Sequence, residues 1–63
     1  MNELRALRHN KGYSQYQMAL ALGISLSLYE KVERGAVRAS ASFIRRVWAF
    51  FPDASIERIF FSR

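Results

Sequence analysis

The sequence predicts an all-α fold, a single compact domain of five short helices that spans residues 1–63. A chain of 63 residues is long enough for one hydrophobic core and too short for two. Glycine, serine and proline divide it into five segments, and in these segments the apolar residues are spaced three or four apart. Long alternation of apolar and polar residues, which is typical of strands, is missing from the sequence.

The first predicted helix covers residues 3–11. Leu4 and Leu7 stand three apart and therefore lie on the same side of a helix. Gly12 follows and predicts a left-handed residue that ends the helix.

A second and a third helix are predicted within residues 14–34. Ser14 stands three residues before Gln17, the spacing of a capping box at a helix start. Gly23 ends this helix, and after one intervening residue Ser25 caps the next one. The side chains expected to point inward from these two helices are Met18, Ala19, Leu22, Tyr29 and Val32.

A connecting loop is predicted over residues 36–42, after Gly35, with Ser40 or Ser42 as the cap of a fourth helix. Pro52 ends that helix. The residues expected in the core from this segment are Ile44, Val47, Trp48 and Phe51.

Ser55 is predicted to cap a last helix, which points its apolar side chains inward. These side chains are Ile56, Ile59 and Phe60. The last third of the chain carries more aromatic rings than one small core can hold, so some must face outward or a partner. We therefore expect a homodimer interface made by Phe51, Ile56, Phe60 and Phe61.

The charge balance indicates a polyanionic partner. Ten Lys and Arg against five Asp and Glu give a net charge of +5 and a pI near 10.5. Composition alone is equally compatible with arginines that keep an apolar chain in solution. The positions of the charges along the chain must distinguish between these two explanations.

Several classes of protein are excluded by what the sequence lacks. It has no cysteine and one histidine, His9, so neither a disulfide framework nor a zinc site is expected. We expect no other metal, no cofactor and no enzyme activity, because no nucleophile, base and acid stand in a suggestive pattern. Neither a membrane span nor a secretion signal is indicated, so the expected location is the cytoplasm, in association with the nucleoid.

Two capped helices joined across Gly23 to Ser25 predict a helix-turn-helix, which places its second helix in the major groove of DNA. If Tyr29 and Val32 point inward, the opposite face presents Leu26, Ser27, Glu30 and Lys31 to the base edges.

Each of these side chains has a counterpart on DNA. Ser27 can bond a base edge or a phosphate, Lys31 a guanine or a phosphate, and Glu30 a cytosine amine, while Leu26 can touch a thymine methyl. Gln15 lies in the first turn of its helix, where backbone donors favour a phosphate, and Ser14 lies beside it.

The stretch from Ser14 through Ser25, followed by Val32-Glu33-Arg34-Gly35, resembles the Cro and phage-repressor type of helix-turn-helix regulators, the XRE family. The resemblance extends upstream to Leu4 and Arg8, and more loosely downstream, so it covers nearly the whole chain.

The resemblance implies a five-helix lambda-repressor-like domain that binds a palindromic operator as a symmetric dimer and regulates transcription, here by repression. It assigns DNA contacts to Ser14, Gln15, Ser25, Leu26, Ser27, Glu30, Lys31, Arg34 and Arg38. It also implies a salt bridge between Arg8 and Glu33, which otherwise are ordinary surface charges. Arg45, Arg46 and Arg58 belong to a solvated face.

The sequence departs from the family pattern at three places. Tyr29 stands where Ile or Val is common, so its ring must fit the core or its hydroxyl must reach solvent or phosphate. Leucines at 20, 26 and 28 replace polar residues and make the reading face unusually apolar. Residues 51–55 are one residue longer than the usual connection.

A second function stays open beside the first. The same helical scaffold can serve as a protein-interaction module, such as the antitoxin of a toxin-antitoxin pair. That function predicts an unmatched apolar surface and weak binding to DNA of any sequence.

Overall fold

The computed structural model describes residues 2–61, and within them every regular element is a helix. The helices are α1 (Glu3–Asn10), α2 (Gln15–Leu22), α3 (Leu26–Glu33), α4 (Ala41–Phe50) and the short π-helical η1 (Glu57–Phe61). The predicted all-helical, five-helix fold is therefore confirmed.

The helix starts follow the local signals in the sequence. The side chain of an Asn or Ser accepts a hydrogen bond from the third backbone N–H of each α-helix, at 3.0 to 3.1 Å. The capping residues are Asn2, Ser14, Ser25 and Ser40. The capping box of α2 is complete, because the Gln17 side chain accepts in turn from the Ser14 backbone at 2.8 Å. Of the two caps considered for α4, the structure has Ser40.

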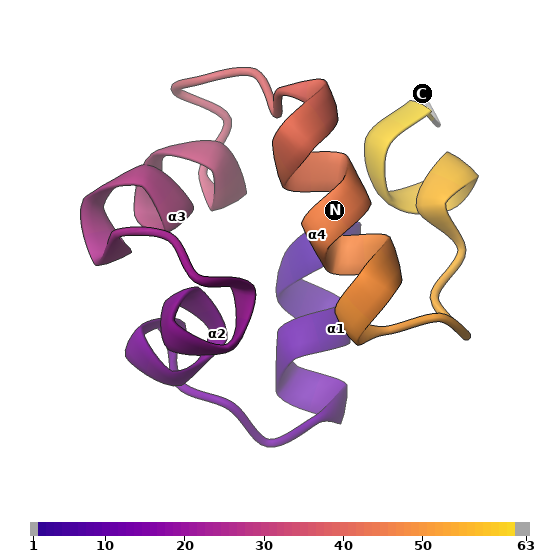
Figure 1. Cartoon of the computed structure of the whole chain (residues 1–63), viewed down its shortest axis with the longest axis horizontal. Helices are drawn as coiled ribbons and strands as arrows, with labels where there is room; N and C mark the ends of the chain where they lie inside the picture. Colours follow the sequence, from indigo (N-terminus) through magenta and orange to yellow (C-terminus); the bar gives the residue numbers. More distant parts are fainter. Residues whose placement is uncertain (1, 62–63) are drawn as a thin grey trace.

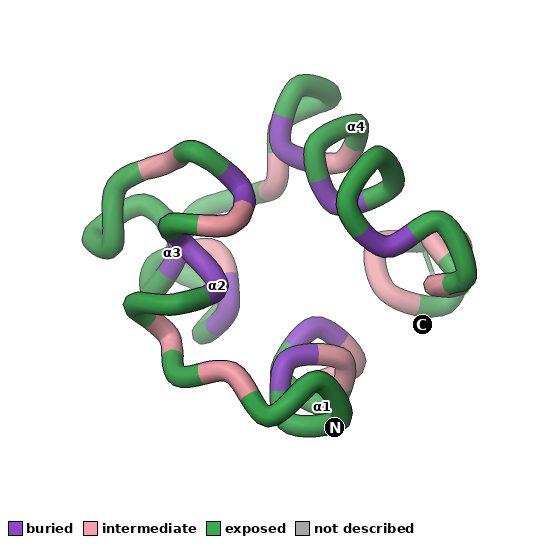
Figure 2. Tube along the Cα trace, turned by 60° about the horizontal axis from the view of Figure 1, so that its bottom comes forward, coloured by how far each residue is buried: buried purple, intermediate pink, exposed green. Residues whose placement is uncertain are grey.

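The helices enclose one core. α4 passes between the α2–α3 pair on one side and η1 on the other (Figure 1). Buried stretches of α1 to α4 turn towards a common centre (Figure 2). The buried apolar side chains are Leu4, Met18, Ala19, Leu22, Tyr29, Phe43, Val47 and Phe51.

The core-facing side of α4 differs from the prediction. Phe43, Val47 and Phe51, spaced four apart, are 5% exposed or less, whereas Trp48 is 61% exposed. The expectation that Trp48 lies in the core is wrong. Phe43 takes the interior position because its ring stacks on that of Tyr29, with centroids 6.3 Å apart.

Phe51 requires a second correction. Its side chain is 5% exposed and packs in the core, with its ring 6.3 Å from that of Tyr13. A residue this deeply buried has almost no surface to offer to a second chain, so it is removed from the expected dimer interface. Ile56 and Phe60 are half-buried against the core, and Phe61 is exposed.

None of the helices among residues 2–61 is long and apolar enough to cross a membrane.

Candidate nucleic-acid interface

The junction between α2 and α3 is fixed by the backbone of Gly23. This residue adopts a left-handed conformation with φ +71°, which glycine reaches without steric cost. Its N–H bonds carbonyls in the last turn of α2, and Ser25 then starts α3. A tight turn of this kind sets the direction of α3 relative to α2.

Arg46 of α4 also holds the junction. Its guanidinium donates to the carbonyl of Leu22, the last residue of α2, at 3.0 Å. This satisfies one of the carbonyls that a helix end leaves without an internal partner. No local signal in the sequence indicates this contact, because it joins residues 24 apart, and the sequence predicts Arg46 on a solvated face.

A buried polar cluster is centred on Glu33, the last residue of α3. Arg8 of α1 donates to both carboxylate oxygens, from Nε at 2.9 Å and from Nη2 at 3.2 Å. The third nitrogen of the same guanidinium donates to the carbonyl of Tyr13 at 3.0 Å. The salt bridge expected between Arg8 and Glu33 is thus present, with Glu33 only 2% exposed.

Two further side chains donate to the same carboxylate. The amide of Gln15 on α2 donates at 2.9 Å, and the hydroxyl of Tyr29 donates from within α3. Asn2 adds a hydrogen bond to the backbone carbonyl of Glu33. Glu33 therefore joins the first three helices through hydrogen bonds, several of them charge-assisted.

These contacts lower the pKa of Glu33. Burial by itself would raise it, but the hydrogen bonds from Arg8, Tyr29 and Gln15 outweigh burial and bring the pKa down to about 2. For Tyr29, burial and the hydrogen bond to Glu33 raise the pKa, so its hydroxyl stays protonated and remains a donor. The Tyr29 hydroxyl bonds Glu33 inside the domain, so it does not reach solvent or a phosphate, which were two of the expected alternatives.

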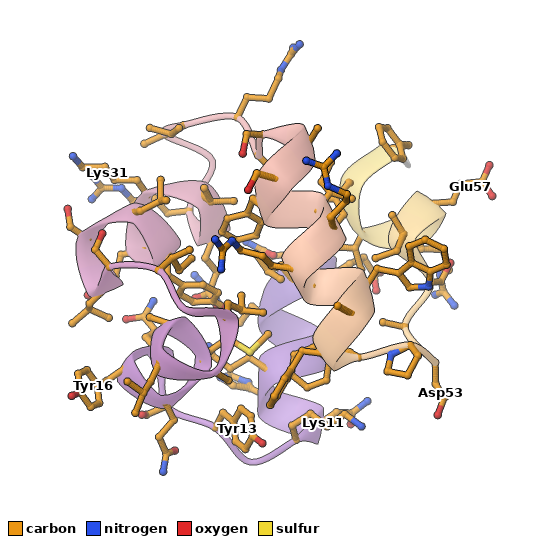
Figure 3. All side chains as sticks on the ribbon, in the orientation of Figure 1. Lys11, Tyr13, Tyr16, Lys31, Asp53 and Glu57 are labelled. Carbon is orange, nitrogen blue, oxygen red and sulfur yellow. The ribbon has the colours of Figure 1, made fainter. Side chains whose placement is uncertain are left out.

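The cluster fixes which face of α3 points outward. Tyr29 and Glu33 are buried on one side, and residues 27, 31 and 34, spaced four and three apart, share the opposite side. Ser27, Lys31 and Arg34 are all exposed. Lys31 points away from the body of the molecule, and the acidic residues Asp53 and Glu57 lie on the far side (Figure 3).

Every residue expected to contact DNA is at the surface, with one partial exception. Exposed are Ser14, Ser25, Leu26, Ser27, Glu30, Lys31, Arg34 and Arg38. Gln15 is half-buried, because Glu33 holds its amide group. The sequence pattern did not indicate that Gln15 and Glu33 are in contact.

The fold and the exposed face of α3 define a helix-turn-helix domain. Residues 2–50 match a family model described as a helix-turn-helix domain. The chain belongs to this family, since the match covers well over half of it, and the helix-turn-helix recognition drawn from the sequence is confirmed.

One curated relative comes from Bacillus subtilis (strain 168) and is described as an uncharacterized HTH-type transcriptional regulator, YazB. It is 48% identical over 42 residues, which make up 67% of this chain and 61% of that protein. The chain thus matches less than two thirds of the length of this relative. No solved structure matches the chain.

Proposed function

We propose that the protein is a sequence-specific, DNA-binding transcriptional regulator that reads the major groove of double-stranded DNA with α3. The observation that carries the proposal is the outward face formed by Ser27, Lys31 and Arg34 on a helix that the Glu33 cluster holds in place. A helix at this position in a helix-turn-helix enters the groove with its N-terminal residues against the base edges. The name of the relative, a transcriptional regulator, supports the same class.

The reading side chains have distinct roles in this proposal. Lys31 reaches guanine acceptors, Ser27 bonds a base edge, and Glu30 accepts from a cytosine amine. Ser25 is engaged as the cap of α3 through its hydroxyl, which leaves it at the groove edge rather than among the bases.

A second group of side chains positions the domain on the sugar-phosphate backbone of DNA. The amide of Gln15 donates one hydrogen to Glu33, and an amide nitrogen carries a second hydrogen that can bond a phosphate. Ser14 lies beside it at the start of α2, while Arg34 and Arg38 follow the end of α3. Phosphate contacts of this kind fix register and orientation without reading sequence.

We further propose that two copies bind a palindromic operator and repress transcription by occupying it. Phe61 of η1 is 65% exposed, and Trp48 and Phe50 expose apolar surface at the C-terminal end of α4. Pairing of two such surfaces, with Ile56 and Phe60 at their edge, would present two copies of α3 to successive turns of DNA, about 34 Å apart.

The test is selection of bound sequences from a random duplex pool, followed by salt titration of the selected site. A palindromic consensus is expected, and binding should weaken steeply as salt rises. Lys31→Ala should relax the sequence preference. Arg38→Ala should weaken all sequences alike and reduce the salt slope by about 1.

Arg58→Ala is the matched control, because it also removes one positive charge but lies on η1, across α4 from α3 (Figure 1). It should leave both the consensus and the salt slope nearly unchanged. A pool that yields no enriched sequence would overturn the proposal.

A second candidate function, a protein-interaction module such as an antitoxin, is favoured by one observation. Tyr16 and Leu20, one turn apart on α2, are 61% and 67% exposed and form an apolar strip beside the reading helix. This function predicts tight binding to a protein partner and weak binding to DNA of any sequence. The two functions are compatible within one chain.

A further inference from the structure

A groove with a volume of about 1140 Å³ lies between η1, the start of α1 and the segment that follows α3. We call it the η1 groove, and it is lined by residues 2–4, 32–35, 37–39, 44 and 58–61. Pockets that take a small molecule have volumes of about 300–1,000 Å³. The η1 groove is therefore large enough for a length of peptide chain.

Hydrogen bonds within the domain hold two walls of the η1 groove. The side chain of Asn2 donates to the backbone carbonyl of Glu33, which ties the start of α1 to the end of α3. The carbonyl of Lys31 accepts from the backbone N–H groups of Ala36 and Val37, at 2.9 and 3.2 Å, which fixes the segment after α3. A partner that binds here does not bear the free-energy cost of ordering these walls.

Half-buried apolar side chains make up much of the lining, namely Val32, Ile44, Ile59 and Phe60. The ring of Phe60 is held edge-on against that of Phe43, with centroids 6.1 Å apart. Most of this surface is aliphatic, so it suits the apolar side chains of a peptide better than the bases of a single nucleic-acid strand, which stack on aromatic rings.

Positive charge accompanies this apolar surface. The exposed side chains of Arg34, Arg38 and Arg58 line the groove together with one carboxylate that is not buried, that of Glu3. The ion pairs found within residues 2–61 join Glu33 to arginines of α1, so none of the three groove arginines has a carboxylate partner there. Carboxylates of a partner would complement them, because arginine binds carboxylate through paired, charge-assisted hydrogen bonds.

A second copy of this chain is a poorer occupant of the η1 groove. It would bring the same arginines and a net charge of +5 of its own, and like charges that face each other across an interface cost free energy. Phe60 and Phe61 line the groove and also belong to the surface proposed for pairing. The groove is therefore tested at Val37 and Arg58, which lie outside the pairing surface.

We propose that the η1 groove binds an acidic, apolar peptide segment of a partner protein. The carboxylates of the segment pair with Arg34, Arg38 and Arg58, and its apolar side chains cover the aliphatic lining. Because Arg34 and Arg38 are also the phosphate contacts proposed above, the peptide and operator DNA compete for the same two guanidinium groups. Peptide binding stands independently of the proposed function, whereas the competition rests on it. A partner with such a segment would release the chain from its operator.

The test is selection of peptides that bind the full chain from a library of random dodecapeptides displayed on phage. Enriched sequences should combine Asp or Glu with Leu, Ile or Phe. Binding of an enriched peptide, synthesised with a fluorescent label, is then measured by anisotropy. Val37→Glu should abolish binding, because it places a negative charge in the lining. Leu20→Glu is the matched control: it puts the same charge on an exposed residue of α2 outside the groove and should leave binding unchanged.

A second variant separates peptide binding from DNA binding. Arg58→Ala should weaken peptide binding by about two- to fivefold, the size expected for one exposed ion pair, and leave operator binding nearly unchanged. Arg45→Ala removes the same charge from an exposed residue of α4 outside the groove and should affect neither ligand. Selected operator DNA should displace the peptide from the parent chain, and Arg38→Ala should weaken the binding of both.

A library that enriches no acidic, apolar sequence would overturn the proposal, and so would a peptide whose affinity survives Val37→Glu or Arg58→Ala. If no peptide is enriched and a short deoxythymidine strand binds in a manner that depends on these two residues, the groove takes single-stranded DNA instead. A peptide that binds in the groove but is not displaced by operator DNA would refute the sharing of Arg34 and Arg38. If the duplex pool yields no preferred sequence while the peptide binds, the regulator function fails and the peptide site stands. Circular dichroism confirms that each variant is folded.

Discussion

The hydroxyl of Tyr29 donates a hydrogen bond to the carboxylate of Glu33, one helical turn further along α3. Both side chains are buried, at 0% and 2% exposed. The ring of Tyr29 fills the core against Phe43, while its polar end completes the shell of donors around the carboxylate. Tyr29 therefore contributes both to the apolar core and to the polar cluster around Glu33.

Tyr29→Phe should destabilise the fold by about 1–2 kcal/mol, because it keeps the ring and removes a donor from a buried carboxylate. Urea unfolding followed by circular dichroism measures the change. Tyr16→Phe is the matched control, since Tyr16 is largely exposed on α2, and it should change the free energy of unfolding by less than about 0.5 kcal/mol. Equal effects of the two changes would contradict the role assigned to the Tyr29 hydroxyl.

The low pKa of Glu33 predicts a loss of stability in acid. The pKa is about 2 in the folded chain and 4.5 in the reference state, so the ionised carboxylate favours folding above pH 4.5. This contribution, about 3 kcal/mol for a shift of this size, should decline as the pH falls from 4.5 towards 2. Unfolding in urea at a series of pH values measures it.

Glu33→Gln is the variant that checks this assignment. It should be less stable than the parent at neutral pH by about 3–5 kcal/mol, because Arg8 loses its buried partner. If the variant remains folded, its stability should vary much less with pH between 4.5 and 2. If it unfolds, stabilisation by trimethylamine oxide allows the same comparison, and an unchanged acid slope would refute the assignment to Glu33.

Gly23→Ala should destabilise the chain more than Gly12→Ala. Both glycines have φ near +70°, so an alanine at either position carries the strain of a left-handed residue, about 1–2 kcal/mol. A Cβ at Gly23 would also lie 3.0 Å from the guanidinium of Arg46, whereas one at Gly12 would meet nothing within 4 Å. Displacing Arg46 from the Leu22 carbonyl should add about 0.5–1.5 kcal/mol. In an Arg46→Ala background the two substitutions should cost the same, and a persistent difference would argue against this contact.

Phe61→Glu should shift the chain from dimer to monomer, because it places a charge in the apolar surface proposed for pairing. Sedimentation equilibrium at high micromolar concentration, with and without operator DNA, measures the shift. Leu20→Glu is the matched control: it introduces the same charge at a similarly exposed residue of α2 and should leave the dimer intact. A monomeric parent chain under both conditions would refute the pairing.

Local signals in the sequence predicted the starts and ends of the helices well. A capping serine and a left-handed glycine act within a few residues, so Ser14, Gly23 and Ser25 could be assigned without knowledge of the tertiary fold. The helix-turn-helix, and the outward direction of Lys31, follow from these assignments together with the helical period.

The sequence-based predictions were wrong or incomplete where contacts between residues far apart in the sequence determine which side chains are buried. Phe43 stands four residues before Val47 and Trp48 four residues after Ile44, so both fit a helical spacing, and the position of Tyr29 selects Phe43 for the interior. For the same lack of tertiary information, the contact between Arg46 and Leu22 was not predicted, and Phe51, although expected in the core, was also assigned to a dimer interface. Spacing alone shows that a helix has an apolar side but leaves its rotation about its own axis open.

Glu33 accepts hydrogen bonds from side chains of α1, α2 and α3, and this limits how the chain can evolve. A replacement at position 33 leaves the charge of Arg8 buried and unpaired, which destabilises the fold. A substitution of either residue is therefore tolerated only when the other is substituted as well. We expect Arg8, Gln15 and Glu33 to be inherited as a set among related sequences. The exposed residues of α3 make no such buried contacts, so they can vary in sequence and change the binding preference without loss of stability.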